Sequence, residues 1–143
     1  MTLSESLERC IQAWKQMGVQ LLPPAHHDKI DAIMKEIGRR ASADIFQLYE
    51  SSGGFAGGAC DAHVWSFWPL ERVREVNDAY PRPQMAFSDG LIDSFYLCFQ
   101  FEDELVSSVW VDHGIDMDLV RVADSLAEFF ELYLSHPERI GLV

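Results

Sequence analysis

The chain has few cysteines and few basic residues, and it has no long hydrophobic run. Its three cysteines, Cys10, Cys60 and Cys98, are odd in number and form no Cys-x-x-Cys pair, which argues against a disulfide framework or a zinc site. No apolar stretch approaches the roughly 20 residues that a membrane span needs. The first residues lack the basic and apolar regions of a signal peptide. We therefore expect a cytoplasmic protein with reduced cysteines.

Basic residues are outnumbered by acidic ones, 11 to 23, which gives a net charge of -12. Residues 1–40 carry six basic and five acidic side chains, whereas residues 41–143 carry five basic and 18 acidic ones. A surface with this excess repels nucleic acid and anionic membranes and attracts basic proteins. The charge therefore predicts that the protein binds neither nucleic acid nor a membrane. It leaves two interpretations open, a basic protein partner and solubility alone.

Recognisable catalytic motifs are also missing. The glycine-rich segment 53–58 has no Lys-Ser/Thr after it and follows a helical pattern instead of a strand, so we interpret it as a connector and not as a phosphate loop. The five histidines form no i, i+4 zinc pair. His63 lies close in sequence to Asp61 and to two possible nucleophiles, Ser66 and Cys60. Near neighbours on an extended strand nevertheless make a poor nucleophilic triad. These observations predict no enzyme, no cofactor and no bound metal.

A metal-dependent hydrolase is the alternative that the acidic residues leave open. Four side chains near the C-terminal strands are of kinds that bind metal ions: Asp112, His113, Asp116 and Asp118. Asp89 and Asp93 could complete a two-metal site. The spacing fits no EF-hand loop, so solvated turn residues are the favoured interpretation.

Helical periodicity marks both ends of the chain. Capping boxes at Thr2/Glu5 and Ser125/Glu128 predict a first helix ending near Gly18 and a final helix ending before Pro137. Two further helices are expected, from about residue 28 to 38 and in a short segment after residue 42. A helical turn is expected over residues 70–77.

Strand patterns occupy the middle of the chain. Residues 63–68 form a strand candidate, and alternating aromatic residues predict a strand over 95–101. The acidic turn 102–104 and the returning strand 105–112 complete a hairpin. The order of these elements predicts one α+β domain spanning residues 1–143, with a single, mainly antiparallel sheet packed with N-terminal and C-terminal helices.

Three segments resemble one family, the SUKH superfamily, whose members are also called SMI1/KNR4-like domains. The first runs from the Leu-Pro-Pro-Ala of residues 22–25 to the glycine pair 53–54, and the second is the Trp-Pro-Leu of residues 68–70. The third includes Asp89-Gly90, Tyr96 and residues 122–126, with Phe129. One departure is that Ala41-Ser42 stands where the family commonly has Leu-Pro.

The resemblance implies an SMI1/KNR4-like α+β fold and, in bacteria, an immunity protein that binds and blocks a cognate polymorphic toxin. Other relatives act as regulatory or scaffold interaction modules. We expect steric occlusion by an acidic face that steers toward a basic toxin domain. The carboxylates expected on this face are Asp89, Asp93, Glu102, Asp103, Glu104, Asp112, Asp116 and Asp118. The sequence leaves the oligomeric state and the identity of the toxin open.

Overall fold

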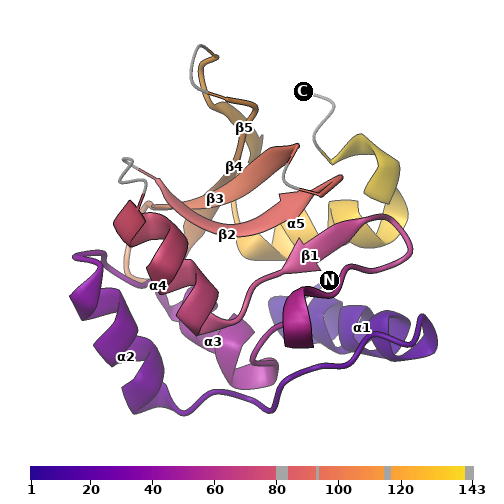
Figure 1. Ribbon diagram of the computed structural model, residues 1–143, viewed down its shortest axis with the longest axis horizontal. Coiled ribbons are helices and arrows are strands. Elements are labelled where there is room, and N and C mark those ends of the chain that lie inside the picture. The colour runs from indigo at the N-terminus through magenta and orange to yellow at the C-terminus, as the bar shows by residue number, and fades with distance from the viewer. Residues whose placement is uncertain (80–83, 93, 115–116, 141–143) are drawn as a thin grey trace.

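The computed structural model describes residues 1–79, 84–92, 94–114 and 117–140, and within them it contains five α-helices and one five-stranded sheet (Figure 1). The helices are α1 (Leu3–Gln16), α2 (His27–Glu36), α3 (Ala43–Ser51), α4 (Leu70–Ala79) and α5 (Leu126–Ser135). The strands are β1 (Trp65–Phe67), β2 (Met85–Gly90), β3 (Phe95–Phe101), β4 (Ser107–Asp112) and β5 (Val120–Ala123). Two short 3-10 helices are η1 (Ala56–Gly58) and η2 (Pro137–Arg139).

The predicted helix ends are largely confirmed. The Thr2 side chain accepts a hydrogen bond from Glu5 N at 3.2 Å, and the Ser125 side chain accepts one from Glu128 N at 3.1 Å. These bonds satisfy backbone N–H groups that have no partner inside the helix. Ser42, in contrast, precedes α3 without a side-chain capping bond. Its hydroxyl is hydrogen-bonded to Asp44 and Ser107 instead.

The sheet is an antiparallel meander in the order β1-β2-β3-β4-β5. Figure 1 shows α5 behind the sheet, α1 and α3 below it, and α4 beside β2. Alternation along β3 sends Leu97 and Phe99 toward the helices, where Phe99 stacks on Phe87 at 3.8 Å between ring centroids and Phe87 meets Phe129 of α5. Tyr96 therefore points to the opposite face of the sheet.

The core between helices and sheet is rich in aromatic rings. Trp14 of α1 is fully buried and lies 5.7 Å from Trp65 and 5.0 Å from Phe55, measured between ring centroids. Phe67 and Phe130 also contact it. Aromatic side chains bury large apolar areas, so this cluster ties the N-terminal helix, β1 and α5 together.

Two strands were not expected from the sequence, β2 and β5. β2 is buried along its whole length and contains a bulge between Ala86 and Ser88. β1 pairs only with the second half of β2. Beside the first half, the Asn77 side chain of α4 bonds Ala86 N at 3.0 Å and Ala86 O at 2.9 Å, which satisfies backbone groups that a longer β1 would otherwise pair.

The predicted fold class is confirmed: the protein has an α+β fold with one antiparallel sheet. Within the described part of the chain, none of the helices combines the length and apolar character needed to cross a membrane.

Candidate functional site

The predicted acidic residues fall into two groups at opposite ends of β3. Asp89 of β2 and Asp112 of β4 both pair with Tyr96, so the three side chains form one cross-strand row. The acidic turn, residues 102–104, follows the other end of β3, roughly 20 Å away at about 3.4 Å per strand residue. Asp118 is exposed before β5, and Asp93 and Asp116 lie outside the described residues.

The carboxylates of the acidic turn are bonded within the molecule. Asp103 accepts hydrogen bonds from Leu105 N at 2.8 Å and Val106 N at 2.9 Å, which closes the turn. Glu104 forms an ion pair with Arg40. Glu102 accepts a bond from the Ser108 hydroxyl at 2.7 Å and lies 3.4 Å from a guanidinium nitrogen of Arg121. This turn therefore has a structural role in addition to its charge.

The Asp89 and Asp112 carboxylates differ in accessibility. Asp89 is only 7% exposed and accepts a hydrogen bond from Trp68 Nε1 at 2.5 Å. Asp112 is half-buried at the end of β4 and accepts a bond from Gly114 N at 3.0 Å. Asp112 is therefore better placed than Asp89 to meet a partner.

The sheet face opposite α5 carries partly exposed aromatic side chains, and we call it the open face, defined by Tyr96, Gln100, Ser108 and Trp110. Tyr96, Gln100 and Trp110 are half-buried. Trp110 Nε1 donates to the Ser108 hydroxyl at 2.8 Å, and the Arg121 guanidinium lies 5.6 Å from the Trp110 ring. Hydrogen bonding and this cation–π contact fix the indole in one orientation on the surface.

Trp65 and Trp68 point to opposite faces of the sheet, as their odd spacing predicts. Trp65 packs among the core rings, whereas Trp68 lies on the side of Tyr96, with ring centroids 5.6 Å apart. The Arg72 guanidinium covers Trp68 at 4.8 Å. Both tryptophans are buried, so Trp110 is the one of the three that offers an aromatic surface to a partner.

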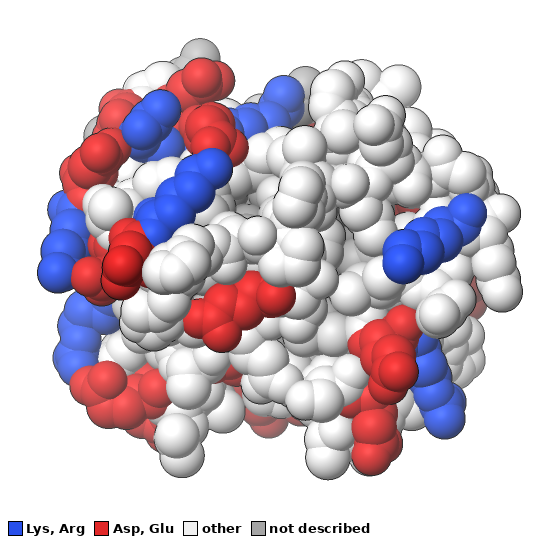
Figure 2. Space-filling view, turned by 90° about the horizontal axis from the view of Figure 1, so that it is seen from below, with Lys and Arg blue, Asp and Glu red and all other residues white. Residues whose placement is uncertain are grey.

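The helical side of the molecule differs from the open face in its surface charge. Figure 2 shows this side from below: charged side chains of both signs gather at the left, a smaller group of both signs lies at the right, and the centre is mostly uncharged apart from an acidic side chain. Ion pairs of Lys29 with Glu71 at 2.5 Å and of Arg74 with Glu36 at 3.4 Å join α2 to α4 in this region. Lys29 lowers the pKa of the Glu71 carboxyl by hydrogen bonding to it. Mixed charge of this kind gives no preference for a basic partner.

A buried network that the sequence did not reveal lies at one end of the sheet. Asp61 accepts hydrogen bonds from Trp65 N at 3.0 Å, from His63 N at 2.8 Å and from the Tyr133 hydroxyl. Burial, followed by the bond to Asp61 and its charge, raises the pKa of Tyr133. Asp61 thus holds β1 against α5 and is not aligned as part of a triad with the His63 ring. Asp61 and Tyr133 are 72 residues apart, so no local pattern could join them.

Two further sequence hypotheses concern the glycine-rich segment 53–58 and the suggested metal sites. In segment 53–58, Gly54 has φ +106°, and a Cβ there would lie 2.8 Å from the Trp68 backbone, so this glycine serves a close backbone approach. Across the described ranges, no group of three or more His, Cys, Asp or Glu side chains is arranged to hold a metal ion. Asp93 and Asp116 of the suggested metal sites fall outside those ranges.

In comparisons with known proteins, no family model and no curated protein matches this chain. The resemblance to the SUKH superfamily therefore stays a prediction.

Proposed function

We propose that this chain is a protein-binding module that holds a basic partner on the open face of its sheet. The observation that carries the proposal is Trp110, a large aromatic side chain fixed in place yet only half-buried. Tryptophan and tyrosine are enriched among the residues that dominate binding energy at protein interfaces. Tyr96, half-buried two strand positions along the same face, extends the aromatic surface.

Charge supports the choice of a basic partner. Asp112 pairs with Tyr96 in the sheet register, and Glu102 lies beside Ser108 on the Trp110 side. The net charge of -12 adds a long-range field of the same sign. Such a field speeds the encounter with a positively charged protein and slows encounters with acidic ones.

The resemblance described above supports a narrower proposal, in which the basic partner is a toxin domain and this chain is its immunity protein. The mechanism is then steric: a partner held on a rigid sheet has its own active site covered. This mechanism requires no catalytic group on the immunity protein. A regulatory or scaffold role would use the same face with a partner that is not a toxin.

A kinetic binding experiment tests the proposal. The partner to use is a candidate toxin domain of net positive charge, in catalytically inactive form, with rates measured at several salt concentrations. Asp112→Lys should slow association and flatten its salt dependence, because it reverses a charge at the proposed interface. Trp110→Ala should speed dissociation at least tenfold, consistent with a loss of roughly 2 kcal/mol.

Glu8→Lys is the matched control, because Glu8 is exposed on α1, away from the open face, and the substitution changes the net charge equally. An equal loss of association rate with Glu8→Lys would show that only the overall charge matters. Unchanged dissociation with Trp110→Ala would remove the open face as the binding site. Co-expression with the active partner separates the two roles, since rescue of growth is expected of an immunity protein alone.

A further inference from the structure

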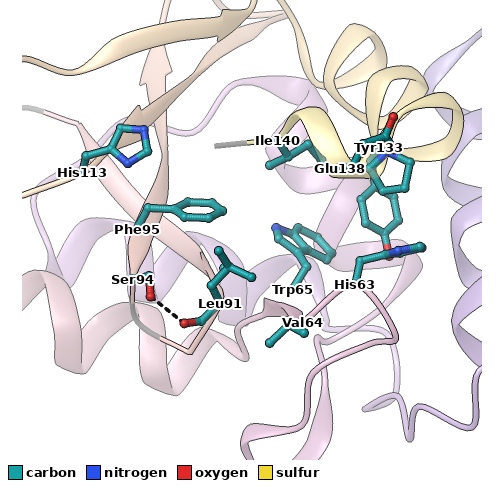
Figure 3. A pocket seen from close by; sticks show the side chains of 12 residues that line it. His63, Val64, Trp65, Leu91, Ser94, Phe95, His113, Tyr133, Glu138 and Ile140 are labelled. Atoms are coloured by element: carbon teal, nitrogen blue, oxygen red, sulfur yellow. Dashed lines mark hydrogen bonds between the residues drawn. The ribbon is translucent and has the colours of Figure 1, made fainter. Parts of the chain in front are cut away.

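A pocket of about 270 Å³ lies at the end of the sheet where the Asp61 network is found (Figure 3). Its walls come from the start of β1, the β2–β3 turn, the end of β4 at His113, and the C-terminal segment at Ile140. These segments are far apart in sequence and meet only in the fold. The volume is just below the range for small-molecule sites, which begins at about 300 Å³.

The aromatic walls of the pocket are held rigidly. Trp65 stacks on Trp14 with 22° between the ring planes, and its ring centroid lies 4.8 Å from that of Tyr133. The Tyr133 hydroxyl accepts a hydrogen bond from Trp14 Nε1 at 2.7 Å and donates to Asp61. These contacts restrain the rings of Trp65 and Tyr133 from rotating into the pocket.

The opposite wall is the Phe95 ring, whose position depends on Gly90. A Cβ added at Gly90 would lie 2.1 Å from Cζ of Phe95, so the Phe95 ring can lie across the strand only because residue 90 has no side chain. This contact places the ring at the edge of the pocket, facing Trp65 across the open space in Figure 3.

The rim of the pocket carries backbone strain. Val64 and Leu91, which line the pocket, have φ of 59° and 51°, and Ile92, the next residue along the chain, has φ of 55°. Branched side chains rarely adopt such values. Leu91 N donates to Val64 O at 2.8 Å, so two of these residues are directly connected. Leu91 and Ile92 are also 57% and 78% exposed despite their apolar side chains. Strain of this kind is concentrated at ligand-binding sites.

One polar atom in the pocket has no partner. The Trp65 side chain is 3% exposed, and its Nε1 forms no hydrogen bond with any described residue. The other three indole nitrogens, of Trp14, Trp68 and Trp110, all donate to protein oxygen atoms. Figure 3 shows the Trp65 nitrogen on the ring edge that faces the space between Phe95 and Ile140. A buried N–H without an acceptor is unfavourable. Because Trp65 Nε1 has less than 1 Å² of accessible surface, an acceptor in the pocket satisfies it only when a neighbouring side chain of the lining moves aside.

We propose that this pocket binds a small molecule with an apolar body and one acceptor oxygen, a carbonyl or a carboxylate, which Trp65 Nε1 recognises. The apolar body would pack against the rings of Phe95 and Tyr133. His113 and His63 at the lining can bond a second polar atom, since an imidazole donates through one or both ring nitrogens. The Ser94 hydroxyl donates its proton to Leu91 O at 2.7 Å, so toward a ligand it can only accept. This site is separate from the open face and does not depend on a protein partner.

Nuclear magnetic resonance of the 15N-labelled protein tests the site through its four indole N–H signals. The probes are phenylacetate, phenylacetamide and toluene, which share an aromatic body and differ in the acceptor. The Trp65 signal should move downfield and saturate with phenylacetate or phenylacetamide, because its N–H gains an acceptor. The comparison between these two probes distinguishes a carboxylate from a neutral carbonyl. Toluene should bind about tenfold more weakly than the preferred probe, since it leaves the donor unsatisfied.

Two variants complete the test. Trp65→Phe keeps a ring and removes the donor, so it should abolish the difference between toluene and the acceptor probes. Ile140→Phe narrows the pocket without touching the donor and should weaken all three probes. The signals of Trp14, Trp68 and Trp110 report whether each variant is folded. A Trp65 signal that never moves, or equal affinity for toluene and both acceptor probes, would overturn the proposal.

Discussion

The two turns at the ends of β3 differ in how they use their side chains. The β3–β4 turn is rich in charge, and its carboxylates bond to neighbouring backbone and side-chain groups. The β2–β3 turn presents Leu91 and Ile92 to solvent in left-handed backbone conformations and borders a pocket with an unsatisfied donor. Charge density is therefore a poor guide to which surface is available for binding. Strain and unsatisfied groups are the more informative signs.

The two ends of the sheet should differ most in how much the free energy of unfolding falls when one aspartate is removed from each. Asp61→Ala should lower the free energy of unfolding by roughly 3 kcal/mol, because it leaves buried donors at Trp65 N and the Tyr133 hydroxyl without an acceptor. Asp103→Ala should cost only about 1 kcal/mol, since the two N–H groups it releases can bond to water. Urea denaturation of both variants measures the difference. Equal losses would mean that the pocket end is no more tightly organised than the acidic turn.

The strands differ in how well the sequence could predict them. β3 was predicted because it alternates between a core face and a half-exposed face. β2 was missed because it is buried on both faces, is interrupted by a bulge and contains Ala86, Ser88 and Gly90, none of which favours a strand. β5 has only four residues, half of them exposed, so its pattern is too short to detect.

The candidate sites were less predictable than the fold. The sequence does not distinguish Trp110 from the three buried tryptophans, and only its neighbours in three dimensions show that it is half-exposed. The pocket depends on contacts between β1 and α5 and on left-handed backbone at Val64 and Leu91, where sequence rules expect Gly, Asn or Asp. No local signal marks such residues.

A smaller effect should follow from relieving the strain at the apolar turn. Ile92→Asn should raise the free energy of unfolding by roughly 1 kcal/mol, because Asn adopts the left-handed conformation more readily than a β-branched residue. Leu105→Asn is the matched control in the acidic turn: Leu105 is 70% exposed, and its φ is not positive. Thermal or urea unfolding of both variants checks the prediction. A gain of equal size in Leu105→Asn would assign the effect to reduced apolar exposure and not to backbone strain.

The smallest expected effect concerns the anchor of the acidic turn, Asp44 of α3. Its backbone N–H donates to Leu105 O at 3.2 Å, and its carboxylate accepts a bond from Ser107 N at 3.1 Å. Burial raises the pKa of this carboxyl above its ordinary 3.8, against the opposing effect of the hydrogen bonds from Ser42 and Ser107. Just above pH 3.8, the folded state therefore keeps a proton that the unfolded state has lost.

It follows that the Asp44 contribution to the free energy of unfolding decreases as pH rises through this window. Asp44→Asn cannot titrate but keeps an oxygen that accepts the Ser107 N–H bond, so its stability relative to the wild type should improve as pH increases from about 4 to 7. Glu71→Gln is the control of opposite sign, because the pKa of Glu71 is lowered by Lys29 and its contribution is lost as pH falls. Urea denaturation from about pH 3 to pH 7 measures both differences, because the Glu71 contribution is lost only below the ordinary carboxyl pKa of 4.5. A wild-type-to-Asn difference that stays constant with pH would show that Asp44 does not link protonation to the folding of the acidic turn.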